Sequence, residues 1–227
     1  MTPLPPMRLF WSQVFAILWK DLRCELRSRQ IALAMGMFAL LVLVVFNFAF
    51  DLQANNKTAV APGALWIAFV FASVLSLGRT FAAEQEKGSL DRLLLCPVDR
   101  KAVYLAKLLG NLLFVGAVEL VALPIFAVIY DLPVLQVPLL PIVALGTLGV
   151  AAVGTLFSAV AANTRAREVL LPLLVFPLVV PVVIAAVKAT QGLLTPDITH
   201  PWLGMLIAFD VIFVSVSFVT FPYVIEE

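Results

Sequence analysis

Ionisable residues inside long apolar segments are the first candidates for chemistry in this chain. Glu119 and Asp210 each stand in an apolar run long enough to form a membrane-spanning helix. A carboxyl group is costly to bury in an apolar medium, so one that is kept there marks either a functional site or a structural contact. The functional interpretation is a polar feature on a substrate path or an interhelical contact that responds to ATP. A hydrogen bond to a neighbouring helix explains the same residues and is the favoured interpretation.

Sequence motifs for hydrolytic or nucleotide chemistry are missing. The chain has no G-x-x-x-x-G-K-[ST] phosphate loop and no H-E-x-x-H zinc motif, and its one histidine lies outside the apolar runs. The spacing of Cys24 and Cys96 fits neither a metal site nor a redox pair, so free thiols are expected. The sequence therefore predicts no catalytic residue, no metal site and no covalently bound cofactor. Any ATP that is used must bind to a separate subunit.

One substantial polar segment separates two of the apolar runs, at residues 84–107, and reads EQEKGSLDRLLLCPVDRKAVYLAK. Ser89 can cap a short helix that Pro97 ends, and Asp99 can cap a longer helix that begins at Arg100. In the short helix, residues 90, 93 and 94 are leucines on one face. Such a helix suits docking into a groove on a soluble partner. The leucines could equally rest on the lipid interface or on neighbouring helices.

Composition places these segments in a membrane. The 227 residues are 63% hydrophobic and 13% charged, with a mean hydropathy of +1.07, which excludes a water-soluble domain. The net charge of +1 gives no basic field for nucleic acid. A hydrocarbon core about 30 Å thick needs about 20 apolar helical residues. Runs of that length occur at 31–50, 62–82 (with Pro62 at the helix start), 108–130, 138–162, 168–187 and 203–224.

Residues 1–30 form a separate amphipathic segment. Its large apolar residues recur at helical spacing, and basic residues lie elsewhere around the wheel. The apolar residues are Trp11, Val14, Phe15, Leu18, Leu22 and Leu26. We expect a helix lying in the cytoplasmic interface, although a cytoplasmic extension of the first span would use the same residues. A cleaved signal peptide is not expected.

The distribution of basic residues predicts the orientation. Thirteen of the fifteen Lys and Arg residues fall in the N-terminal segment, in 79–107 and in 163–167, whereas only Lys57 and Lys188 fall on the other side. Positive charge stays in the cytoplasm. The N-terminus is therefore expected inside, and an even number of spans returns the C-terminus there.

The segment GRTFAAEQEKGSLDRLLLCPVDRKAVYLAK, followed by a span containing ELVALP, closely resembles the CcmB family, the haem exporter B permeases of cytochrome c maturation. The likeness covers essentially the whole chain. It implies an all-α integral membrane protein like the type-2 ABC exporters, with an interfacial segment at 1–30, a six-span permease domain at 31–227 and a cytoplasmic coupling loop at 84–107. It further implies a location in the bacterial inner membrane.

The resemblance also implies partners and a site. The loop would touch a CcmA-like ATPase through Glu84, Glu86, Gly88, Leu90, Asp91, Leu93, Leu94 and Pro97. CcmC- and CcmD-like membrane proteins, a CcmE-like haem chaperone and a second copy of the chain are further expected partners. Haem would be the substrate, or ATP would only release the haem-loaded chaperone. The alternative is a type-2 exporter permease for lipid, polysaccharide or drug.

Three further features carry weaker hypotheses. His200 beside Trp202 could contact haem, although an ordinary loop residue is favoured. The prolines of the fifth span predict kinks that could serve a gate; they are Pro172, Pro177 and Pro181. The glycines of the fourth span predict tight helix packing or a dimer contact; they are Gly146, Gly149 and Gly154.

Overall fold

In the computed structural model, the chain is described over residues 6–28, 30–50, 54–86, 95–132, 138–162, 164, 166–194 and 201–225. Every regular element in these ranges is a helix. Helix α1 (Pro6–Ser28) comes first and the short α4 (Ala82–Glu86) follows the second span. The long apolar helices are α2 (Gln30–Ala49), α3 (Ala54–Thr80), α6 (Arg100–Tyr130), α7 (Leu139–Ala162), α8 (Arg167–Leu194) and α9 (Trp202–Val224).

These six long helices are each long and apolar enough to cross a membrane, which confirms the predicted all-α, six-span architecture. One detail of the prediction is wrong. Pro62 does not start the second span, because α3 begins at Ala54 and Pro62 lies inside it. The missing N–H of a proline is tolerated inside a membrane helix when neighbouring groups satisfy the freed carbonyl. The prolines of the fifth span likewise lie within one helix, α8.

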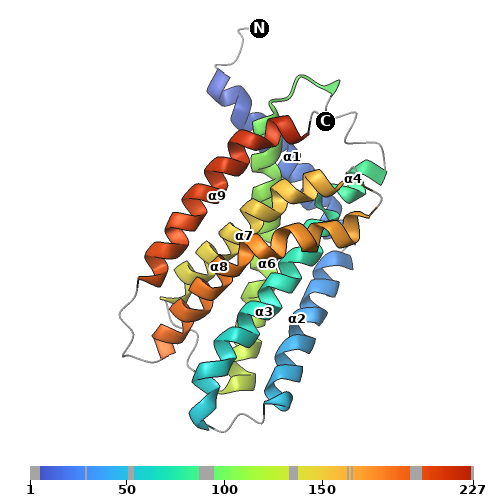
Figure 1. Ribbon diagram of the computed structural model, residues 1–227. Coiled ribbons are helices and arrows are strands. Elements are labelled where there is room, and N and C mark those ends of the chain that lie inside the picture. The colour runs from blue at the N-terminus through green and yellow to red at the C-terminus, as the bar shows by residue number, and fades with distance from the viewer. Residues whose placement is uncertain are drawn as a thin grey trace.

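Helix α7 is the centre of the bundle. It packs against α3, α6, α8 and α9, and Figure 1 shows it running through the middle of the molecule, with α2 at an outer edge. Its small residues allow these neighbours to come close. A Cβ atom at Gly146 would lie 2.2 Å from the ring of Trp66 on α3, and one at Gly154 would lie 2.2 Å from Leu77. The predicted tight packing around these glycines is therefore confirmed.

Besides its contact with Gly146 of α7, Trp66 is bound to α8. Trp66 is buried, and its indole Nε1 donates a hydrogen bond to Thr190 Oγ1 of α8 at 2.9 Å. A buried indole N–H needs such an acceptor because water cannot reach it. Trp66 thus links α3, α7 and α8.

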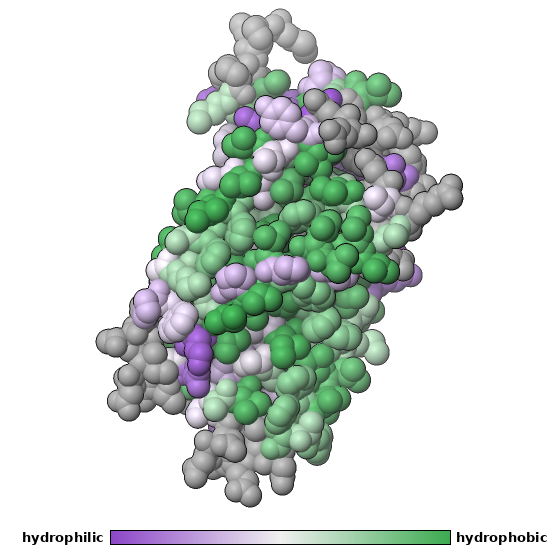
Figure 2. Space-filling view, viewed as in Figure 1, coloured by the Kyte–Doolittle hydropathy of each residue, from purple (hydrophilic) through white to green (hydrophobic). Residues whose placement is uncertain are grey.

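The outer surface of the bundle is apolar. Figure 2 shows hydrophobic residues covering most of the visible body of the bundle. Large apolar side chains such as Leu120 and Val128 on α6 and Val211 on α9 are more than 60% exposed. A water-soluble protein does not expose so continuous an apolar face, whereas the bilayer requires one.

Helix α1 lies at the end of the bundle where α9 finishes (Figure 1). Val14 and Ile17 are buried against α6, while Trp11, Phe15 and Trp19 are exposed at four-residue spacing. The helix therefore has one apolar face on the protein and a second, aromatic face outside it. The predicted helix is confirmed; its place in the lipid interface stays a prediction.

The tight contact at Gly146 gives a first prediction. Gly146→Ala places a methyl group in the Trp66 ring, and overpacking of this kind costs about 1–3 kcal/mol. We expect a lower midpoint of thermal unfolding in detergent. The matched control is Gly116→Ala on α6, where no atom lies within 4 Å of the added Cβ and the midpoint should not fall. Equal midpoints for Gly146→Ala and wild type would contradict this packing.

Candidate functional site

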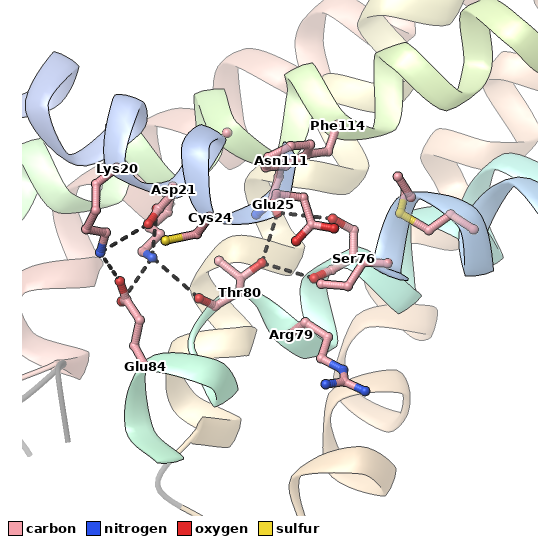
Figure 3. Close-up of a pocket in the computed structure, with 15 residues that line it drawn as sticks. Lys20, Asp21, Cys24, Glu25, Ser76, Arg79, Thr80, Glu84, Asn111 and Phe114 are labelled. Atoms are coloured by element: carbon pink, nitrogen blue, oxygen red, sulfur yellow. Dashed lines mark hydrogen bonds and ion pairs between the residues drawn. The ribbon is translucent and has the colours of Figure 1, made fainter. Parts of the chain in front are cut away.

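A ring of alternating charges joins α1, α4 and α6 at one end of the bundle (Figure 3). Lys20 pairs with Asp21 at 3.1 Å and also with Glu84. Lys107 Nζ lies 2.9 Å from Asp21 Oδ2 and 2.9 Å from Glu84 Oε2. Each lysine therefore touches both carboxylates. The first and last residues of segment 84–107 meet in this ring, which we call the charge ring: Lys20, Asp21, Glu84 and Lys107.

The charge ring is unevenly buried. The side chain of Lys107 is 3% exposed and that of Glu84 is 11% exposed, whereas that of Lys20 is 47% exposed. Lys107 also lies over the ring of Phe81, 5.4 Å from its centroid. A buried ammonium ion is strongly destabilising without carboxylate partners. Asp21 and Glu84 are therefore required to keep Lys107 in place.

The pKa values reflect these contacts. Burial by itself raises the pKa of Glu84, but the charge of Lys107 and hydrogen bonds from Lys20 and Lys107 outweigh it, so the pKa lies below its usual value. Burial by itself lowers the pKa of Lys20, but the hydrogen bond to Glu84 and the charge of Asp21 hold it above its usual value. Both groups are charged at neutral pH.

A second contact ties α1 to the other end of the same segment. The side-chain amide of Gln13 donates to the carbonyl of Pro97 at 3.3 Å and accepts from the backbone N–H of Asp99 at 3.2 Å. Asp99 in turn caps α6 by accepting from the N–H of Lys101 at 2.9 Å, which confirms the predicted cap. Helix α1 therefore holds segment 84–107 at two places, through Lys20 and through Gln13.

One helical turn along α6 from the charge ring, hydrogen bonds between uncharged polar side chains connect three helices. Asn111 of α6 accepts from Thr80 Oγ1 of α3 at 2.9 Å and donates to Thr155 Oγ1 of α7 at 3.0 Å. Lys107 and Asn111 are one helical turn apart, so the charge ring and this bridge lie on one face of α6. A movement of α4 or α1 would reach α3, α6 and α7 through these contacts.

A cavity of about 230 Å³ lies beside the charge ring, between α1, α2, α3 and α6. Its polar wall carries the ring together with Arg79, Ser76 and Asn111, and its apolar wall includes Ile31 and Met35. Figure 3 shows Arg79 pointing away from the ring. No hydrogen bond or ion pair joins the side chain of Arg79 to another residue in the described part of the chain.

The structure describes only part of the predicted coupling residues. Glu84 is buried in the charge ring, and Pro97 is exposed with its carbonyl bound by Gln13. Glu86 ends α4. Gly88, Leu90, Asp91, Leu93 and Leu94, with the expected Ser89 cap, lie outside the described residues. A role for these residues in ATPase contact stays a prediction.

The two predicted intramembrane carboxyls are separate from each other. Glu119 is 3% exposed and accepts a hydrogen bond from Thr147 Oγ1 of α7 at 2.6 Å. Asp210 is 4% exposed and packs against Gly149, and neither of its side-chain oxygens has a hydrogen-bond partner among the described residues. The structural hydrogen bond favoured from sequence is present at Glu119 and not at Asp210.

The structure describes only one of the two residues that the haem hypothesis names at the other end of the bundle. His200 lies outside the described residues, and Trp202 begins α9, half-buried against the core. Within the described ranges, no group of three or more His, Cys, Asp or Glu residues could hold a metal ion. Cys24 and Cys96 form no disulfide there.

Sequence reasoning missed most of the charge ring. The sequence identifies Lys20 and Lys107 only as basic residues of the N-terminal segment and of the loop, and it assigns no role to Asp21. One signal was available: Lys107 directly precedes a long apolar run, and a lysine at such a position needs carboxylate partners. Nothing in the sequence names those partners, because Asp21 and Lys107 are 86 residues apart.

Fold and site together define a multi-pass α-helical membrane protein whose polar, charge-bearing groups gather at one end. The chain matches the model of the family described as "CcmB protein" over residues 12–226. It is 35% identical to heme exporter protein B of Rhodobacter capsulatus over 74% of this chain and 78% of that protein. It is 31% identical to the protein of that name from Pseudomonas aeruginosa over 80% and 83%. The chain belongs to the CcmB family.

Unequal burial of the two ring lysines gives a second prediction. Lys107→Met leaves two carboxylates with only the half-exposed Lys20, and breaking a buried pair costs roughly 3–5 kcal/mol. Lys20→Met breaks a more exposed pair, which is worth about 1 kcal/mol or less. We expect thermal unfolding in detergent to show a much larger loss for Lys107→Met. Equal losses would contradict the uneven burial.

The lowered pKa of Glu84 gives a third prediction. Its contribution to stability is present above the unfolded carboxyl pKa of about 4.3 and is lost as pH falls through the lower folded value. The difference in unfolding midpoint between wild type and Glu84→Gln should therefore be constant from pH 6 to 8. It should shrink only below about pH 4.3. A difference that disappears already near pH 6 would contradict the ring.

Proposed function

We propose that this chain is the permease subunit of an ABC-type complex for cytochrome c maturation and takes part in haem export. The observation that carries the proposal is the family match, which runs from within α1 to the end of α9. Relatives named heme exporter protein B support haem as the cargo. Haem is then a substrate rather than a resident cofactor.

ATP would be bound by a separate CcmA-like subunit that docks on segment 84–107. The charge ring supports a role for this segment in transmitting movement. Glu84 and Lys107, at its two ends, are bonded to each other and to α1. A force on residues 87–94 would then reach α1 and α6 together instead of moving a loose loop. The segment and α1 would act as one body.

We further propose a bacterial inner-membrane location with both termini in the cytoplasm. The start of α1 and the end of α9 lie at the same end of the bundle (Figure 1), and thirteen of the fifteen Lys and Arg residues belong to that side. CcmC- and CcmD-like proteins, a CcmE-like chaperone and a second copy of this chain would be the membrane partners. The chain itself would have no catalytic activity.

Substitution of the expected docking leucine gives a fourth prediction. Leu93→Asp should reduce holo-cytochrome c production at least tenfold while the partner ATPase still hydrolyses ATP, because a charge on the docking face breaks the contact. The matched control is Leu95→Asp, two residues away and 86% exposed, which should remain close to wild type. Normal maturation with Leu93→Asp would contradict the coupling role.

Cargo can be tested apart from coupling. Sealed inside-out membrane vesicles that contain the whole complex are given haem with ATP or with a non-hydrolysable analogue, and haem reaching the lumen is measured. Accumulation that requires hydrolysable ATP supports haem export. ATP-dependent release of the chaperone without any lumenal haem would instead make this chain a transducer only.

A further inference from the structure

An apolar groove of about 690 Å³ runs along the outside of the bundle between α2 and α6. Its α2 wall includes Leu33, Met37 and Leu40, and its α6 wall includes Val121 and Ile125. Leu33, Met37 and Val121 are each more than 60% exposed. In a membrane this groove opens toward the lipid, where empty space is filled by hydrocarbon chains rather than by water.

The length of the groove matches the depth of one leaflet of the bilayer. On α2 it reaches from Ala32 to Leu43, and eleven helical rises of 1.5 Å give about 17 Å. A hydrocarbon core of about 30 Å makes each leaflet about 15 Å deep. One acyl chain of a single leaflet therefore matches its length.

At the end nearest α1, the groove meets the polar cavity beside the charge ring. Glu25, Ala32 and Phe114 line both spaces. The four residues of the ring neutralise one another, and the cavity also holds the carboxylate of Glu25 and the guanidinium of Arg79. No ion pair joins the Arg79 side chain to a carboxylate among the described residues, so its guanidinium is available to a phosphate. Basic pockets between membrane helices bind lipid head groups, and arginine pairs with phosphate through charge-assisted hydrogen bonds.

We propose that this cavity and groove bind one membrane phospholipid, with its phosphate on Arg79 and one acyl chain along α2 and α6. The lipid would fill the space between α1, α2 and α6 and support the charge ring from the side. The site borders segment 84–107 only at its end residues Glu84 and Lys107, and the proposal does not depend on which cargo the complex moves.

The test uses the complex purified in mild detergent and native mass spectrometry. Dioleoyl phosphatidylglycerol is the probe, and dioleoylglycerol, which has the same chains without the phosphate, is compared with it. Wild type should bind the phospholipid at least tenfold more tightly than dioleoylglycerol. Arg79→Gln should abolish this difference, and Arg79→Lys should retain most of it. Arg8→Gln, which removes a cation on α1 that lines neither space, should change nothing.

A second variant tests the groove. Gly36 lines it, and an added Cβ there meets no atom within 4 Å, so Gly36→Leu should fold and weaken binding of both probes at least fivefold. Gly116→Leu, at a glycine with equally open surroundings outside the groove, should bind as wild type does. Unchanged binding in Arg79→Gln or in Gly36→Leu would overturn the proposal. So would retention of haem or of a second copy of the chain at these residues in place of phospholipid.

Discussion

Burial of Lys107 is the constraint on which the end of the bundle that carries the charge ring depends. Its ammonium group is almost completely enclosed, and two carboxylates from different parts of the chain neutralise it. Asp21 belongs to α1, and Glu84 belongs to α4. Since an uncompensated buried charge is so costly, α1 and α4 cannot leave α6 without a large loss of stability. The electrostatic requirement of one lysine thus fixes three helices.

Because of this constraint, segment 84–107 is attached to α1 instead of forming a loose loop. Its ends meet at the charge ring, and the side chain of Gln13 holds Pro97 and Asp99 from α1. Helix α1 presents Trp11, Phe15 and Trp19 away from the protein, an aromatic face suited to the membrane interface. The segment proposed to receive the ATPase is therefore joined to a helix suited to rest on the bilayer. The Asn111 bridge continues the connection to α3 and α7.

The six spans could be predicted from sequence because length and hydropathy alone determine whether a helix can cross a bilayer. The cap at Asp99 and the close packing at Gly146 and Gly154 were also predictable, since they depend on local residue types. The start of α3 was not predictable. Proline often begins helices in water-soluble proteins but is tolerated within membrane helices, as Pro62 is here. The charge ring was not predictable either, because Asp21, Glu84 and Lys107 come together only through the packing of α1 on α6. For Glu119 the sequence favoured a hydrogen bond without naming Thr147 as its donor.

The central claim is that α1 and segment 84–107 move as one body. The direct measurement is the distance between spin labels at Phe15 and Leu95, both exposed, by pulsed electron paramagnetic resonance on the whole complex with Cys24 and Cys96 replaced by serine. The distance should be the same with and without trapped ATP in the wild-type background. The distribution of this distance should broaden in Lys107→Met. A distance that changes with ATP while the charge ring is intact would contradict the account.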